Sequence, residues 1–258
     1  MHKLIETRRD ELLGKDFDTT NSGECFVIDY NGRNDVTVIF YKPFYITKCK
    51  FYMLQKGYVK NPLYPSVFKS GFLGVGKYSY KNKEARRMWT HLIERCCSKD
   101  FKKVNPHYKD VSVCDEWLNF QTFAEWCYNQ EFFNAKDENG KVYHLDKDIL
   151  VKGNKIYSPD TCCFVPSVIN GLLLNCKSRR GVLPLGVRLQ NGKYTARAKN
   201  IRGKEKHLGV FNCPIEAFLA YKLEKESVVK QVAEVWKGRI CDKVFQSLMK
   251  YSVDIEDW

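Results

Sequence analysis

The segment from residue 144 to residue 170 constrains the fold more than any other part of this chain. A short β-rich run, 142–145, delivers Asp146 to the end of a predicted strand. A polar loop with glycine and proline turn residues follows, and Pro166 suits the first turn of a helix because its missing N–H costs no hydrogen bond there. Asn170 then lies about one turn into that helix. The pattern predicts a strand end and a helical turn that aim oxygen ligands at one point, an arrangement suited to Mg²⁺.

The same segment resembles the ββα-metal finger of HNH nucleases, in the variant common in phage proteins and homing endonucleases. The middle of that family's pattern matches Tyr-Ser-Pro-Asp at 157–160 and Cys162. The resemblance implies that Asp146 and Asn170 are the metal ligands and that the ion is Mg²⁺ or Mn²⁺. It also implies that the segment is a small catalytic module on a helical scaffold.

Two positions depart from the family pattern. Lys147 stands where the general-base histidine belongs, and Thr161 stands where a middle asparagine belongs. His144 is the only histidine nearby, so it is the candidate for a displaced catalytic base. Lys147 is a poor base unless its pKa is strongly lowered, but it is a candidate for neutralising phosphate charge. Asp148 either supports the metal or is a solvated loop residue, and the second reading is favoured.

The net charge favours a polyanionic partner. The chain has 43 Lys and Arg against 30 Asp and Glu, a formal charge of +13. Nucleic acid is the simplest such partner, and a basic protein without one is the alternative. No apolar run approaches the roughly 18–20 residues of a membrane span, so we expect no membrane partner. The first residues lack a hydrophobic targeting core, which predicts a cytoplasmic protein, in the host cell if a phage encodes it.

The spacing of the eleven cysteines suits neither a disulfide framework nor a zinc site. There is no Cys-x-x-Cys, and Cys96-Cys97 and Cys162-Cys163 are adjacent pairs. The others are scattered among apolar residues. The odd count, with no targeting segment, predicts reduced thiols of the kind found in a cytoplasm.

Turn signals and composition predict an α+β chain of several modules. Residues 1–80 read as a small β-barrel-like module with a hairpin signal at 31–34. This module resembles the small N-terminal repeats attached to phage HNH-type proteins, and packing on a neighbour is as probable a role for it as direct DNA contact. Residues 81–178 hold the finger with supporting helices, and the apolar spacing predicts two of these at 86–97 and 120–128. Their aromatic residues are expected in the core rather than as base-stacking platforms.

Residues 179–258 contain three β-rich runs, 185–189, 193–198 and 207–211, and then a helix that begins near Pro214. Asn-Gly between the first two runs is a hairpin signal, so we expect a three-stranded antiparallel sheet plus helices. The unit resembles the Apetala-type DNA-binding domain, which implies that the sheet enters the major groove of double-stranded DNA. The basic side chains of this region are the candidate DNA-binding residues: Arg179, Arg180, Arg188, Lys193, Arg197, Lys199, Arg202 and Lys204.

Taken together, these resemblances imply an HNH-type homing endonuclease that hydrolyses phosphodiester bonds in duplex DNA with Mg²⁺ or Mn²⁺ and no small-molecule cofactor. The alternative is a catalytically inactive, sequence-selective DNA-binding or regulatory protein that keeps the same fold. Loss of both the base histidine, at position 147, and the middle asparagine, at position 161, favours this alternative. A third reading is an effector that binds an acidic host protein through its positive surface.

Overall fold

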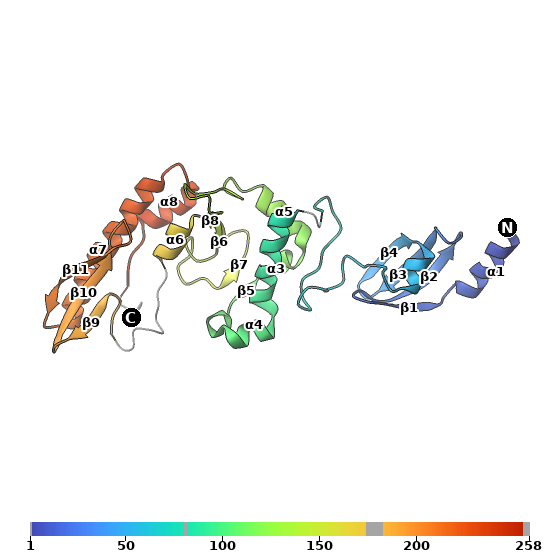
Figure 1. Cartoon of the computed structure of the whole chain (residues 1–258), viewed down its shortest axis with the longest axis horizontal. Helices are drawn as coiled ribbons and strands as arrows, with labels where there is room; N and C mark the ends of the chain where they lie inside the picture. Colours follow the sequence, from blue (N-terminus) through green and yellow to red (C-terminus); the bar gives the residue numbers. More distant parts are fainter. Residues whose placement is uncertain (1, 80–81, 174–182, 255–258) are drawn as a thin grey trace. The chain divides into compact units, whose positions relative to one another are not determined.

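The computed structural model describes residues 2–79, 82–173 and 183–254 of the 258-residue chain. It contains helices and several small sheets, which confirms the predicted α+β class. The chain folds as two compact units, Met1–Asn129 and Gln130–Trp258 (Figure 1). The predicted module boundaries at 80–81 and 178–179 fall outside the described residues. Among the helices that are described, none combines the length and apolar character needed to cross a bilayer.

The first unit begins with a four-stranded antiparallel meander that lies between two helices in the sequence. Its elements are α1 (His2–Leu12), β1 (Asp16–Thr19), β2 (Gly23–Tyr30), β3 (Val36–Tyr41), β4 (Phe44–Cys49) and α2 (Phe51–Gln55). In the described residues β1 and β4 are open edges, so the prediction of a barrel-like module was wrong on closure. Four short strands are too few to close around a core, and this sheet instead buries one face against helices.

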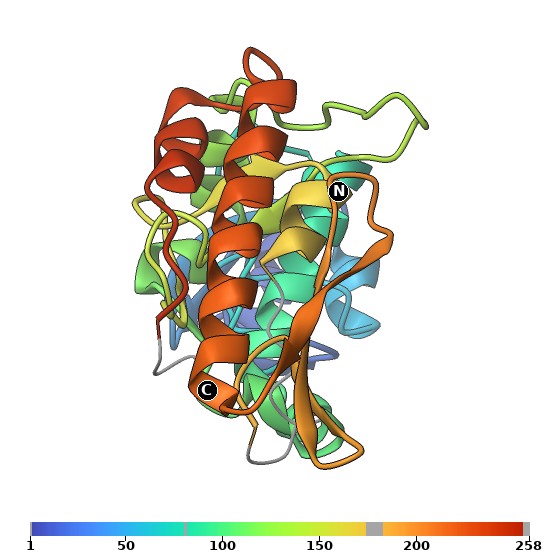
Figure 2. The same ribbon diagram turned by 90° about the vertical axis from the view of Figure 1, so that its left-hand side faces the viewer.

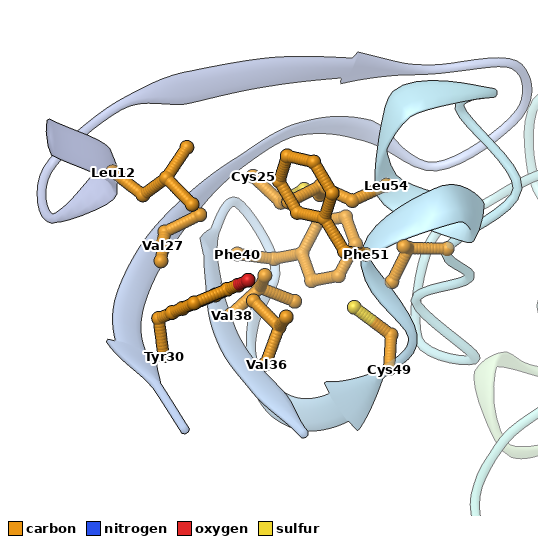
Figure 3. Packing of buried hydrophobic residues seen from close by; sticks show 11 residues of the cluster. Leu12, Cys25, Val27, Tyr30, Val36, Val38, Phe40, Cys49, Phe51 and Leu54 are labelled. Carbon is orange, nitrogen blue, oxygen red and sulfur yellow. The ribbon is translucent and has the colours of Figure 1, made fainter. Parts of the chain in front are cut away.

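Alternation along the strands places the core of this sheet on one face. Val36, Val38 and Phe40 on β3 are buried, and Phe51 and Leu54 of α2 pack against the same cluster (Figure 3). The residues between them on β3 point to the other face, as the two-residue period of a strand requires. The apolar pattern along the strands therefore determines which face the helices cover.

Helices dominate the rest of the first unit. The elements are α3 (Lys83–Cys97), α4 (Lys99–Val104), η1 (Pro106–Tyr108), β5 (Ser112–Val113), η2 (Asp115–Leu118) and α5 (Phe120–Tyr128). Both predicted helices are confirmed. Trp89 and Trp117 are fully buried, and the Trp89 indole N–H donates to the Trp117 carbonyl at 2.7 Å. These aromatic side chains are core, as expected, and not exposed stacking platforms.

The second unit holds residues 144–170 (the finger segment), a sheet within residues 187–211 (the basic sheet) and the helices that pack on them. The elements are β6 (His144–Asp146), β7 (Ile156–Tyr157), β8 (Cys163–Val165), α6 (Ser167–Leu172), β9 (Val187–Gln190), β10 (Lys193–Lys199), β11 (Glu205–Phe211), α7 (Pro214–Trp236) and α8 (Asp242–Met249). Strands β9 to β11 form the predicted three-stranded antiparallel sheet, in the order β11-β10-β9. Figure 2 shows α7 running alongside this sheet.

Helix α7 contributes to two separate cores. Its first half packs against the sheet through Ala217, Phe218 and Tyr221. Its second half packs with α8 and with Cys163, Val165 and Ile169 of the finger segment, through Val228, Val229, Val232 and Ala233. One continuous helix therefore ties the finger segment to the basic sheet.

Gly186, which precedes β9, gives a direct test of this packing. Its φ is +72°, and a Cβ there would lie 1.9 Å from Tyr221 Cδ2. Gly192 has nearly the same φ, +74°, with no atom within 4 Å of a Cβ. We expect Gly186→Ala to lower the free energy of unfolding by roughly 2–4 kcal/mol, and Gly192→Ala by only about 1–2 kcal/mol, in urea denaturation. Equal losses would mean that Tyr221 does not pack on Gly186.

The ten cysteines within the described ranges are free thiols, and several of them lie in the hydrophobic cores. Cys176 lies outside those ranges.

Candidate functional site

Two short strands and a helix build the finger segment. β6 pairs with β8 in antiparallel register, with His144 opposite Val165 and Asp146 opposite Cys163. Asp146 is the last residue of β6, as predicted. Pro166 keeps extended backbone angles and occupies the N-cap, so α6 begins one residue later than the sequence suggested. The strand end and the helix start therefore follow each other in the order that the sequence predicts.

A contact between strand and helix brings two of the candidate residues together. The Asn170 side-chain nitrogen lies 3.1 Å from Nδ1 of His144. His144 and Asp146 are two residues apart on β6, so their side chains leave the same face of the strand. The structure thus brings Asn170 to His144, and Asp146 follows two residues later on the same face of β6.

Asp146 is held by its own loop and is 9% exposed. Its Oδ1 accepts the backbone N–H groups of Asp148 and Ile149, each at 2.9 Å. Burial raises the pKa of Asp146 to about 6, and the negative charge of Asp148 adds to that rise, against the two backbone hydrogen bonds. Asp148, favoured from sequence as a solvated residue, therefore acts on the charge of Asp146.

The contacts of the Lys147 ammonium group argue against a role as a free base. Its ammonium lies 3.2 Å from Oδ2 of Asp148 and 5.7 Å from the ring centre of Tyr157. The side chain is only 14% exposed. The ion pair of Lys147 with Asp148 leaves it as a source of positive charge in the site.

The roles predicted for His144 and Asn170 are coupled through the orientation of one amide. With the Asn170 nitrogen donating to Nδ1, the proton of the neutral imidazole is on Nε2, and the Asn170 oxygen is left for a ligand. The ring then has no free lone pair with which to take a proton. Turning the amide over lets its oxygen accept from the Nδ1 proton and frees Nε2 as a base, while the second lone pair of that oxygen remains for a ligand. His144 as base therefore requires the orientation in which the amide oxygen faces Nδ1.

The donor set has the chemistry of a hard-cation site. Across the described residues, no three His, Cys, Asp or Glu side chains gather in a way that could hold a metal ion. Mg²⁺, however, takes only one or two protein ligands and keeps several waters. A buried carboxylate and an amide oxygen fit that requirement, and the raised pKa of Asp146 reflects a buried charge that a cation would stabilise.

Polar side chains that the sequence did not single out hold the loop between β6 and β8. The Asn154 side-chain nitrogen donates to the carbonyls of Lys147 and Ile156, both at 2.7 Å. Thr161, at the position of the family's middle asparagine, contacts the Ser158 hydroxyl at 2.9 Å and donates to the Ile156 carbonyl at 2.9 Å. Asn154 was visible in the sequence only as a turn residue.

The basic candidates of the sheet lie on or beside the face opposite α7. Ala196 and Ala198 of β10 face the core that α7 completes, so Lys193, Arg197 and Lys199 leave the other face. Arg188 lies on that face of β9, opposite Thr195. Arg202 and Lys204 are exposed in the β10–β11 turn. Arg179 and Arg180 lie outside the described residues.

Glu205, the only acid among the described residues of this face, holds two of its arginines. Oε1 of Glu205 lies 3.2 Å from Arg188 Nη2, and Oε2 lies 2.8 Å from Arg197 Nη1. The hydrogen bond from Arg197 holds the pKa of Glu205 below its usual value, with the charge of Arg188 adding to the effect. Sequence reasoning assigned no role to Glu205.

The raised pKa of Asp146 predicts a pH dependence of stability. The folded protein keeps this proton up to about pH 6, whereas the unfolded chain releases it near the ordinary value of 3.8. Between these values the folded state binds more protons, so the free energy of unfolding falls as pH rises, by up to about 3 kcal/mol. Urea denaturation at pH 4 and pH 7 should show this loss in the wild type and not in Asp146→Asn. The same slope in both proteins would contradict the assignment.

No family model matches this chain, and neither a curated protein nor a solved structure does.

Proposed function

We propose that the protein is a metal-dependent DNA endonuclease of the HNH type, which hydrolyses phosphodiester bonds in duplex DNA. In this proposal β6, β8 and α6 form the ββα-metal finger, and β9 to β11 form an Apetala-type DNA-binding sheet. The observation that supports it best is the 3.1 Å contact of Asn170 with His144, which lies two residues before the buried Asp146 on β6. A basic sheet in the same compact unit supplies a surface for the phosphate backbone.

Asp146 and Asn170 would hold the Mg²⁺ or Mn²⁺ ion, which supplies charge stabilisation at the leaving oxygen of the cleaved phosphate. The carboxylate of Asp146 contributes the negative charge, and its backbone hydrogen bonds fix its direction. Lys147, neutralised in part by Asp148, adds positive charge near the phosphate. His144 takes the proton of the attacking water at Nε2 only while the Asn170 amide accepts from Nδ1.

His144→Ala separates the two roles of this histidine. If His144 is the general base, the rate of cutting falls about 10²–10⁴-fold at every metal concentration, and the pH–rate profile loses its lower limb. If it only orients Asn170, we expect a weaker metal affinity, and saturating Mn²⁺ restores most of the rate. Single-turnover cleavage across pH and metal concentration distinguishes these results. An unchanged rate and an unchanged metal affinity would remove His144 from the site.

A second candidate function is a DNA-binding module that has lost cutting. The observation in its favour is Lys147, an ion-paired ammonium at the position of the family's base. A supercoiled-plasmid assay with Mg²⁺ or Mn²⁺, against an EDTA control, decides between the two. Metal-dependent nicking supports the nuclease. DNA binding that weakens steeply with salt, without cutting in either metal, supports the inactive module. Absence of salt-sensitive binding contradicts both.

A further inference from the structure

Three strands bring two arginines and one glutamate together on the open face of the basic sheet. Arg188 is on β9, Arg197 on β10 and Glu205 on β11. The antiparallel register puts Arg188 opposite Thr195 and Arg197 opposite His207, so all three charged side chains leave the same face. Each carboxylate oxygen of Glu205 contacts a different guanidinium, at 3.2 Å and 2.8 Å.

The two contacts restrict the directions that the arginines can take. Arg197 is 33% exposed, and its Nε is buried without a hydrogen-bond partner in the part of the chain that the structure describes. Arg188 is 66% exposed and uses only Nη2 to reach Glu205. Because a guanidinium has five N–H donors in a rigid plane, each arginine keeps donors for another partner. Glu205 thus orders the two arginine side chains without using all of their N–H donors.

Glu205 would lower the affinity of a surface whose only role was to bind phosphates. From Leu183 to Phe211 it is the single acid among seven Lys and Arg residues. Its charge repels a DNA backbone and so lowers sequence-independent affinity. Exposed ion pairs of this kind add little to folding stability. Neither phosphate binding nor stability accounts for the carboxylate at this place, whereas orientation of the two arginines does.

We infer that Glu205 is a positioning residue for sequence recognition, which aims Arg188 and Arg197 at guanine edges in the DNA groove. The inference rests on the proposed function only in that the sheet must bind duplex DNA. An ordered arginine pairs bidentately with O6 and N7 of guanine, the commonest specific contact in the major groove.

Repeated binding selection from duplexes with a randomised centre, using the full-length protein, tests the inference. The wild type is compared with Glu205→Gln, which keeps the size of the side chain and removes its charge. Glu224→Gln is the matched control, because Glu224 pairs with Lys206 of the same sheet at 2.8 Å and touches neither arginine in the described contacts. Thermal unfolding of each variant is measured alongside. Glu205→Asp, which keeps the charge and shortens the reach, covers the case in which Glu205→Gln folds poorly.

We expect the wild type to select a guanine-containing sequence. Glu205→Gln should bind random duplex at least as tightly, while its preference for the selected sequence over a scrambled one falls about tenfold or more. Glu205→Asp should show a similar loss of preference with unchanged affinity for random duplex. Glu224→Gln should keep the preference. In addition, Arg197→Lys should reduce the preference in the wild type and have little further effect in Glu205→Gln, since the two residues act as one unit.

Negative results that overturn the role of Glu205 can be told apart from those that overturn the proposed function. If the wild type selects a motif and both Glu205 variants keep the same preference, the role of Glu205 is wrong and the DNA-binding function stands. A wild type that binds duplex without selecting any sequence also overturns the inference. A wild type without salt-sensitive DNA binding overturns the proposed function itself. An equal loss of preference in Glu224→Gln would assign the effect to net charge and remove the positioning role.

Discussion

Asp146→Asn is expected to abolish metal-dependent nicking, by about 10³-fold or more, while DNA affinity stays within a few-fold of wild type. Asp146 supplies the one buried carboxylate of the proposed metal site, and loss of a positioned metal removes several kcal/mol of transition-state stabilisation. DNA affinity is retained because it comes mainly from the basic sheet. Plasmid nicking and a duplex-binding titration on the same preparations measure the two effects.

Asparagine is a sharper replacement than alanine at this position. Oδ1 of Asp146 accepts two backbone N–H groups of the following loop, and an asparagine oxygen keeps both of these bonds while removing the charge. Asp160→Asn, at an exposed carboxylate of the same loop, is the control for a charge change alone. Binding of Mn²⁺, followed by its electron paramagnetic resonance signal, gives a readout that does not depend on cutting. An Asp146→Asn protein that nicks as fast as wild type rules out this site.

Removing four positive charges from the open face of the sheet is expected to weaken duplex binding by about 100-fold or more at moderate salt. The residues are Arg188, Lys193, Arg197 and Lys199, each replaced by alanine. If all four contact phosphates or bases, the slope of log affinity against log salt also becomes shallower by roughly three to four. Fluorescence anisotropy across a salt series measures both quantities.

The matched control removes the same number of charges from exposed lysines of the same unit that lie on the helical side: Lys230, Lys237, Lys243 and Lys250. This variant should lose only the small affinity that follows from net charge. Equal losses in the two variants would show that affinity comes from overall charge rather than from the sheet. The nuclease proposal would then lack its recognition surface.

Local patterns predicted the elements of the fold well. Apolar spacing identified the helices α3 and α5, and an Asn-Gly pair with strand alternation identified the β9–β10 hairpin. Closure of the N-terminal sheet was not predictable from such patterns, because it depends on how many strands pair and on which face the helices cover. The sharing of α7 between two cores was also missed, since both halves of the helix read only as amphipathic.

The sequence proposes the members of the candidate site but does not give their contacts. Asp146 and Asn170 were identified by position in the strand and helix. The hydrogen bond between Asn170 and His144, which couples their roles, depends on side-chain geometry across 26 residues. The contacts of Glu205 depend on cross-strand register, which includes a shift between Ala196 and Arg197. A one-residue difference in that register would move Glu205 to the opposite face.

Helix α7 connects the finger segment to the basic sheet and also fixes the distance between them. Its two groups of core residues are centred about twelve residues apart, which corresponds to roughly 18 Å along an α-helix. On B-form DNA that is about five base pairs. In a nuclease built this way, the rigid helix fixes the distance along the DNA between the sequence that the sheet recognises and the bond that is cut. Whole helical turns added to α7 would shift the position of the cut in discrete steps. A flexible linker would instead spread the cuts over several positions.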